Sequence, residues 1–220
     1  MFNGFTKAAS DFLWELRFNN ERPWFLEHKD EFEKTVNEPF KALAADTNAL
    51  MTQRHPELGC TLHVSRIYRD ARRLFGRGPY KDHLWFSIKS SKALLEGPMF
   101  WFEVGAADFA YGMGFYSATA ANMQRFRDIV DANPPAFERL IDSMERYPEF
   151  TLDGERYSRP KGTHNEKIDR WYNLKRIGLQ HREDFGGDVL SAELPRILAD
   201  EFEKLIPLYE FCLKFYFDEN

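Results

Sequence analysis

"HLWFSIKSSKALLEGPMFWFEVGAADFAYGMGFY", residues 83–116, is the stretch that decides the fold. Hydrophobic residues alternate with other residues in three of its segments, at 83–90, 98–105 and 109–116. A period of two is typical of strands that bury one face. The short connection "AAD" between the last two segments predicts an antiparallel hairpin. Gly112 and Gly114 indicate that another backbone or side chain approaches the last strand closely.

Segments on either side complete the predicted architecture. "TLHVSRIY" (61–68) and "YNLKRIGLQH" (172–181) also have the pattern of strands, and "EFTLDGERYSRPKGTHNEK" (149–167) that of strand, turn and loop. A helical period follows Thr6, and a second runs from Pro23 to about Gln53 with a kink or break at Pro39. Further helices are predicted over Thr119–Ala132, Phe137–Met144 and Glu166–Trp171. The last predicted helix begins after Ser191 and has a kink at Pro207. We therefore predict an α+β fold: a mostly antiparallel sheet, with a four-strand meander plus later strands, covered by helices, and helical at both ends.

The composition is that of a folded protein. Hydrophobic residues make up 43% of the 220 residues and aromatic residues 16%, which supplies a core and excludes disorder of the whole chain. This length fits one large domain or two small ones. No repeat, low-complexity tract or flexible linker interrupts the chain, so we predict a single domain over residues 1–220.

Two features of the sequence help to predict the cellular compartment of the protein: its two cysteines and its first residues. Cys60 and Cys212 have no metal or redox spacing, although one disulfide between them stays open. The first residues lack the basic region and apolar core of a secretory signal. No apolar run approaches the roughly 18 residues of a membrane helix. We therefore expect a reduced, cytoplasmic protein without membrane contact.

Positive charge is concentrated in two segments of an acidic chain. The net charge is −5, yet residues 66–81 contain six bases against Asp70 alone. Residues 156–176 contain seven bases against Glu166 and Asp169, so each segment is net +5 and the remainder net −15. Such a balance argues against nonspecific coating of DNA, which usually goes with a basic domain. It permits a local anion site, because a focused patch acts through its own field.

The first basic segment, "SRIYRDARRLFGRGPYKDHL" (65–84), is the stronger candidate site. If residues 63–70 form a strand, Arg66, Tyr68 and Asp70 share one face. Arginine binds phosphate or carboxylate with a planar fork, and lysine with a compact charge. The loop is not a P-loop, because the glycine-to-lysine spacing with a following Ser or Thr is absent. Candidate ligand-binding residues are the cations Arg66, Arg69, Arg72 and Lys81, with Asp70 to orient them and Tyr80 to contact the ligand.

The second basic segment contains "SRPKGTH" (158–164). Ser158, Arg159, Lys161 and His164 share the same pocket if the two segments lie close together, and Arg159 and Lys161 then complete its wall. A structural explanation stays open for both segments. In it the cations pair with acids on neighbouring helices, in exposed ion pairs that contribute roughly 0–1 kcal/mol each.

Two functions therefore stay open. The first is binding of, or catalysis on, a phosphate- or carboxylate-bearing small molecule. The alternative is a non-enzymatic interaction module for an acidic protein partner or nucleic acid, with nucleic acid disfavoured by the acidic background although Tyr68, Tyr80 and Trp85 adjoin the basic residues. No histidine has a metal-ligand spacing, and nucleophile elbows and dinucleotide fingerprints are absent, so the sequence assigns no catalytic residue, metal or cofactor.

Four blocks of the chain resemble a bacterial family of conserved hypothetical proteins, catalogued as domain of unknown function 2461 (DUF2461). They are "NNERPWFLEHKDEFEKTVNEP" (19–39), "SRIYRDAR" (65–72), "PYKDHL" (79–84) and "GERYSRPKG" (154–162). Ala71 replaces the threonine usual in that family, and Arg73–Gly78 replaces a lysine-rich stretch. The resemblance implies a cytoplasmic bacterial α+β domain and supplies no activity. Its signature consists of residue types that are usually exposed, which favours a site over packing.

Overall fold

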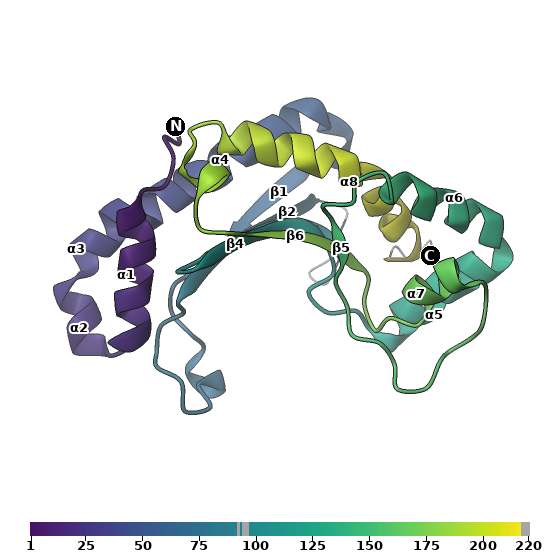
Figure 1. Cartoon of the computed structure of the whole chain (residues 1–220), viewed down its shortest axis with the longest axis horizontal. Helices are drawn as coiled ribbons and strands as arrows, with labels where there is room; N and C mark the ends of the chain where they lie inside the picture. The colour runs from purple at the N-terminus through teal and green to yellow at the C-terminus, as the bar shows by residue number, and fades with distance from the viewer. Residues whose placement is uncertain (92, 94–96, 217–220) are drawn as a thin grey trace. The chain divides into compact units, whose positions relative to one another are not determined.

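The computed structural model describes residues 1–91, 93 and 97–216, and the fold is α+β as predicted (Figure 1). The helices are α1 (Lys7–Phe18), α2 (Arg22–Glu27), α3 (Lys29–Phe32), α4 (Glu38–Arg54), α5 (Ala120–Ala132), α6 (Pro134–Met144), α7 (Glu166–Tyr172) and α8 (Leu194–Tyr216). The strands are β1 (Cys60–Val64), β2 (His83–Ser90), β3 (Met99–Gly105), β4 (Asp108–Gly114), β5 (Thr151–Leu152) and β6 (Gly178–Asp184). Helices therefore occupy both ends of the described chain.

The strands form a six-stranded antiparallel sheet in the order β1-β2-β3-β4-β6-β5. The first four strands are neighbours in chain order, which confirms the predicted meander. β6 then pairs with β5, with Thr151 opposite Gln180 and Leu152 opposite Leu179. The chain divides into two compact units: unit 1 comprises residues 1–88, 101–111 and 182–199, and unit 2 comprises residues 89–100, 112–181 and 200–220. The single domain proposed from the sequence stays a prediction.

Two strand predictions need correction. The strand predicted over 61–68 ends at Val64, so the shared face expected for Arg66 and Asp70 is wrong. The pairing of this segment with β2 ends at Ser65. Its backbone N–H donates to Trp85 O, and its Oγ accepts from Trp85 N. The strand predicted over 172–181 is also misplaced: α7 runs to Tyr172, and β6 begins only at Gly178.

Unit 1 packs its helices on the sheet through aromatic side chains. Phe40 of α4 lies 5.8 Å from Phe86 and 6.4 Å from Phe102, measured between ring centroids. A break at Pro39 is not found, because α3, a π-helical stretch (Glu33–Asn37) and α4 follow one another without a gap, and Pro39 lies in the first turn of α4. Proline has no N–H to donate, and the first turn of a helix accommodates it because the N–H groups there have no intrahelical acceptor.

Unit 2 buries α8 against β3. The Tyr209 ring stacks on Phe100 with centroids 4.5 Å apart, and its hydroxyl accepts a hydrogen bond from Ser90 N. α8 continues through Pro207. The close approach predicted at Gly112 is confirmed, because a Cβ atom there would lie 2.0 Å from Leu179 O on β6. The glycine therefore allows β4 and β6 to lie side by side.

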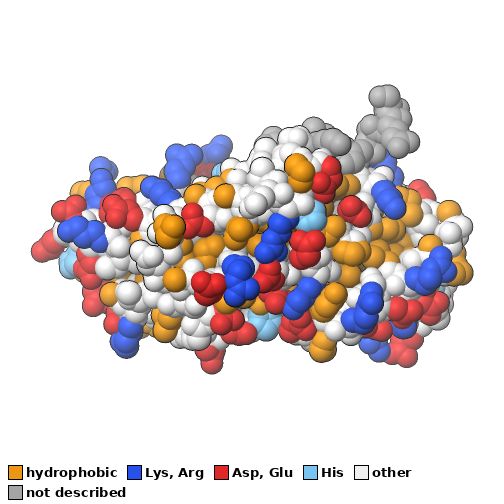
Figure 2. All heavy atoms as spheres, turned by 90° about the horizontal axis from the view of Figure 1, so that it is seen from above, with side chains coloured by type: hydrophobic (Ala, Val, Ile, Leu, Met, Phe, Trp, Pro, Cys, Tyr) orange, Lys and Arg blue, Asp and Glu red, His pale blue; other side chains and the backbone are white. Residues whose placement is uncertain are grey.

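One face of the molecule carries charges of both signs (Figure 2). On the face that Figure 2 shows, the described acidic and basic side chains are interspersed.

Cys60 and Cys212 form no disulfide, and burial raises the pKa of both thiols. Of the helices in the described ranges, none combines the length and apolar character needed to cross a bilayer.

Candidate anion-binding site

The first basic segment forms a long loop in unit 1, between β1 and β2 (Figure 1). Its two arms pair like a short antiparallel ribbon. Tyr68 and Tyr80 form an isolated β-bridge, Arg69 N donates to Pro79 O, and Lys81 N donates to Ile67 O, both at 2.8 Å. The ribbon brings the family blocks "SRIYRDAR" and "PYKDHL" together although the loop tip separates them in sequence.

Three of the predicted cations lie together at the base of this loop. Lys81 Nζ donates a 2.6 Å hydrogen bond to the carbonyl oxygen of Arg66. Partial burial, then the positive charges of Arg69 and Arg66, lower the pKa of Lys81. Arg69 is largely buried, with 15% of its side chain exposed, and its Nε donates to Tyr80 O at 2.6 Å. We call Arg66, Arg69 and Lys81 the cation cluster.

Asp82 supplies negative charge beside the cluster, and the sequence reasoning did not single it out. Its carboxylate lies 3.5 Å from Arg69 Nη2, 3.5 Å from Arg17 Nε and 3.3 Å from His83 Nδ1. Burial acts to raise the pKa of Asp82, but a backbone hydrogen bond, His83 and Arg69 together lower it. One carboxylate thus lies near two arginines and one histidine. Its position directly after Lys81 was the available signal.

Arg72 and Asp70 pair with each other. Asp70 accepts from the Arg72 backbone N–H at 3.0 Å and from Nε and Nη2 at 3.0 and 2.8 Å. The Arg72 side chain is 88% exposed, and the hydrogen bond to Asp70 raises the pKa of the guanidinium. The predicted orienting role of Asp70 therefore concerns Arg72, and this pair is one of the exposed ion pairs expected from the structural explanation.

Tyr80 has a supporting position. Its side chain is 2% exposed and stacks on Phe25 of α2, with ring centroids 4.1 Å apart. Burial raises the pKa of its hydroxyl. The Tyr80 backbone is held by the Asn20 side chain, and a Cβ atom at Gly78 would lie only 2.3 Å from Asn20 Oδ1. Tyr80 thus anchors the loop to the helices.

The remaining two predicted residues, Arg159 and Lys161, belong to unit 2. Arg159 is exposed. Lys161 Nζ lies 4.6 Å from the centroid of the Tyr157 ring. Their participation in one pocket with the cation cluster stays a prediction.

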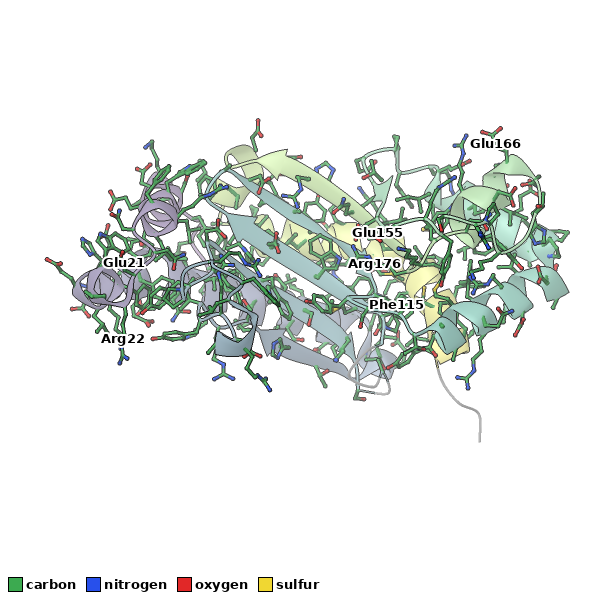
Figure 3. All side chains as sticks on the ribbon, turned by 90° about the horizontal axis from the view of Figure 1, so that it is seen from below. Glu21, Arg22, Phe115, Glu155, Glu166 and Arg176 are labelled. Atoms are coloured by element: carbon green, nitrogen blue, oxygen red, sulfur yellow. The ribbon has the colours of Figure 1, made fainter. Side chains whose placement is uncertain are left out.

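Two pockets lie elsewhere in the units. In unit 2 a pocket of about 380 Å³ is lined by Ser117, Ala118, Glu155, Lys175 and Arg176, with Glu155 and Arg176 labelled in Figure 3. Its cations have acidic partners, since Lys175 pairs with Glu155 and Arg176 with Asp153. In unit 1 a pocket of about 600 Å³ lies beside the ion pair of Arg182 and Asp108. Among the described residues no group of three or more His, Cys, Asp or Glu side chains is arranged to hold a metal ion.

A comparison with known protein families shows which family the chain belongs to. The profile of a family described as "Conserved hypothetical protein (DUF2461)" matches residues 8–211. The chain belongs to the DUF2461 family. No curated protein matches the chain at a significant level. The DUF2461 match contains both basic segments, so the cation cluster and the loop around Lys161 are parts of the family domain rather than additions to it.

Proposed function

We propose that this DUF2461 protein binds a phosphate- or carboxylate-bearing small molecule at the cation cluster. The observation that carries the proposal is the environment of Lys81. Its ammonium group hydrogen-bonds to a backbone carbonyl and lies near two guanidinium groups. Among the described residues no carboxylate lies within ion-pair distance of the Arg66 or Lys81 side chain.

Charge repulsion supports the proposal. Like charges gathered at a partly buried place disfavour one another, and the positive charges of Arg69 and Arg66 add to burial, the larger cause, in lowering the pKa of Lys81. A bound oxyanion offsets the repulsion, and the guanidinium fork of Arg66 offers two parallel hydrogen bonds to it. The proposal covers binding of such a molecule or catalysis on it, in a cytoplasmic bacterial protein as the resemblance implies.

An interaction surface for an acidic protein is the second candidate. It is favoured by two exposed aromatic side chains of the same loop, Tyr68 at 54% and Phe75 at 83% exposure. Phe75 also has a φ of 48°, in the left-handed region that is uncommon for residues other than glycine. Binding to such a surface weakens steeply with salt, because many dispersed charges contribute.

Inorganic phosphate and citrate serve as probes, with binding followed through the amide NMR signals of residues 66–82. We expect Arg66→Gln and Lys81→Met each to weaken binding about tenfold, since each removes a charged hydrogen bond. Arg72→Gln is the matched control. It removes one arginine of the same loop that is already paired with Asp70, so it should bind as the wild type does.

Each contrary outcome has a clear meaning. Equal losses in Arg72→Gln and Arg66→Gln would show that the net charge of the loop, not the cluster, determines binding. If phosphate and citrate leave the signals of residues 66–82 unchanged, the small-molecule proposal fails. A loss of binding to an acidic protein in Phe75→Ser, with a steep dependence on salt, would favour the interaction surface.

A further inference from the structure

In unit 2, Asp131 of α5 holds two side chains that are distant in sequence. Its Oδ1 lies 2.8 Å from His164 Nε2, and its Oδ2 accepts a 2.9 Å hydrogen bond from the Tyr172 hydroxyl. A carboxylate only accepts hydrogen bonds, so the His164 proton must reside on Nε2. In the neutral ring Nδ1 is then an acceptor. His164 makes no other side-chain hydrogen bond among the described residues, and 19% of its side chain is exposed.

The loop that carries His164 is held by α7 and by Asn173, the residue after it. Asn173 accepts from Lys161 N at Oδ1 (2.7 Å) and from Tyr157 N at its backbone oxygen (3.0 Å), and its Nδ2 donates to Gly162 O (3.4 Å). His164 N donates to Asp169 Oδ1 at 2.7 Å. A Cβ atom at Gly162 would lie 2.7 Å from the Tyr172 ring, so this glycine lets the loop lie against the ring. The end of the family block "GERYSRPKG" is therefore held against α7 and Asn173.

Arg127 is the most unusual group near this loop. It lies one turn before Asp131 on α5, is 3% exposed, and its Nε and Nη1 atoms are buried with no hydrogen-bond partner among the described residues. Its guanidinium carbon lies 5.6 Å from the Tyr157 ring and 6.0 Å from the Tyr172 ring. Cation–π contacts offset part of the desolvation. Unsatisfied buried N–H groups are rare in proteins because each loses its hydrogen bonds to water without replacement, and this points to a ligand.

The two tyrosine rings connect the three groups. The Tyr157 ring contacts both Arg127 and Lys161, and the Tyr172 ring contacts both Arg127 and His164, whose ring centroid lies 4.8 Å away. All of them belong to unit 2. Two cations and one oriented imidazole acceptor thus lie around the same pair of tyrosine rings. The cations can bind an anion, and the imidazole can accept a hydrogen bond from an O–H group.

We propose that Arg127, Lys161 and His164 form a second binding site, for a small oxyanion that also carries an O–H group. Hydrogen phosphate and 2-hydroxy carboxylates have this chemistry. Arg127 and Lys161 bind the charge, and His164 Nδ1 accepts the hydrogen bond from the O–H. Asp131 is a positioning residue, because it fixes the tautomer of His164 without contacting the ligand. The site selects phosphate over sulfate and glycolate over acetate, since sulfate and acetate lack the donor.

The test measures binding of these four anions through the side-chain nitrogen NMR signals of His164. The measurement is made at mildly alkaline pH. We expect the Nε2–H tautomer, and phosphate binding about tenfold tighter than sulfate for the one additional hydrogen bond. A tenfold preference for glycolate over acetate instead would identify a hydroxy acid as the ligand class. Equal binding within both pairs, or no binding, would overturn the proposal.

The Asp131→Asn variant distinguishes a binding site at His164 from a purely structural role of Asp131. The asparagine Oδ1 can still accept from Tyr172, and its Nδ2 can donate to His164 Nε2, so both hydrogen bonds that hold the loop remain. The imidazole proton then moves to Nδ1, and the preference for phosphate over sulfate should fall to about one. Loss of the negative charge should leave sulfate binding unchanged or tighter. An unchanged preference in this variant would contradict the assignment.

Substitutions of the cations complete the test. Lys161→Met should weaken phosphate and sulfate equally, whereas Arg139→Gln, which removes an exposed cation of α6 in the same unit, should change neither. Lys81→Met, in the cation cluster, should leave the His164 response intact. Loss of that response in Lys81→Met would assign the observed binding to the cluster instead. Because each site has its own variants and signals, one proposal can fail without the other.

Discussion

The side-chain amide of Asn20 satisfies the backbone of Tyr80, 60 residues later in the chain. Asn20 Nδ2 donates to Tyr80 O, and Asn20 Oδ1 accepts from Tyr80 N, both at 2.9 Å. This pair of hydrogen bonds joins the segment between α1 and α2 to the loop of the cation cluster. It fixes the position of Lys81, the next residue, without contributing charge to the cluster.

Asn20→Ala should therefore lower the free energy of unfolding. The Tyr80 N–H, in a buried residue, loses its acceptor, and an unsatisfied group of this kind costs about 1–3 kcal/mol. Urea denaturation measures the change. Asn19→Ala is the neighbouring control, because the Asn19 amide is exposed and donates to Glu15 O within its own helix end. Equal effects of the two substitutions would contradict the role assigned to Asn20.

Gly112→Ala should destabilise the protein severely. The added Cβ atom would lie 2.0 Å from the backbone oxygen of Leu179, so β4 and β6 must separate. We expect a loss of more than about 3 kcal/mol, or an insoluble variant, by the same denaturation measurement. Gly186→Ala meets nothing within 4 Å and should stay within about 0.5 kcal/mol of the wild type. A well-folded Gly112→Ala protein would show that the strands have room.

Thr47→Val should stabilise the protein or leave it unchanged. Thr47 of α4 is fully buried, and its hydroxyl has no hydrogen-bond partner among the described residues. Valine has the same shape and removes the unsatisfied group, so we expect a gain of up to about 1 kcal/mol in the free energy of unfolding. Thr35→Val, at a hydroxyl that donates to Glu31 O on the exposed face, gives the comparison. A clear loss in Thr47→Val would indicate a bound water or other partner.

Alkaline pH should destabilise the protein through Tyr172. Burial first, then the hydrogen bond to Asp131 and its charge, raise the pKa of Tyr172 from 10 to about 12. A raised folded-state pKa contributes stability that is complete below pH 10 and is lost as pH rises toward 12. We expect this loss to be smaller in Tyr172→Phe, which has no ionisable group there. Thermal unfolding across that range measures it, and parallel curves for both proteins would contradict the assignment.

Local pattern predicted the sheet well because alternation is a property of neighbouring residues. The three segments of residues 83–116 fold as β2, β3 and β4, and Gly112 has the close contact that its position indicated. Alternation failed at the ends of strands. "TLHVSRIY" has the right pattern throughout, but the chain leaves the sheet at Ser65 because Tyr68 pairs with Tyr80 instead.

The sequence by itself determined the α+β class and the segment that contains Arg66, Arg69 and Lys81, since these depend on period and adjacency. It also determined the DUF2461 membership, through the similarity of its sequence blocks to that family. Only the tertiary structure decided which charges pair. It pairs Arg72 with Asp70 and brings Arg17 close to Asp82. It also places Asp131 against His164 and Tyr172, which follow it by 33 and 41 residues. Electrostatic and hydrogen-bond contacts act over a few ångströms. Sequence separation does not reveal such distances, because the folding of loops and helices sets them.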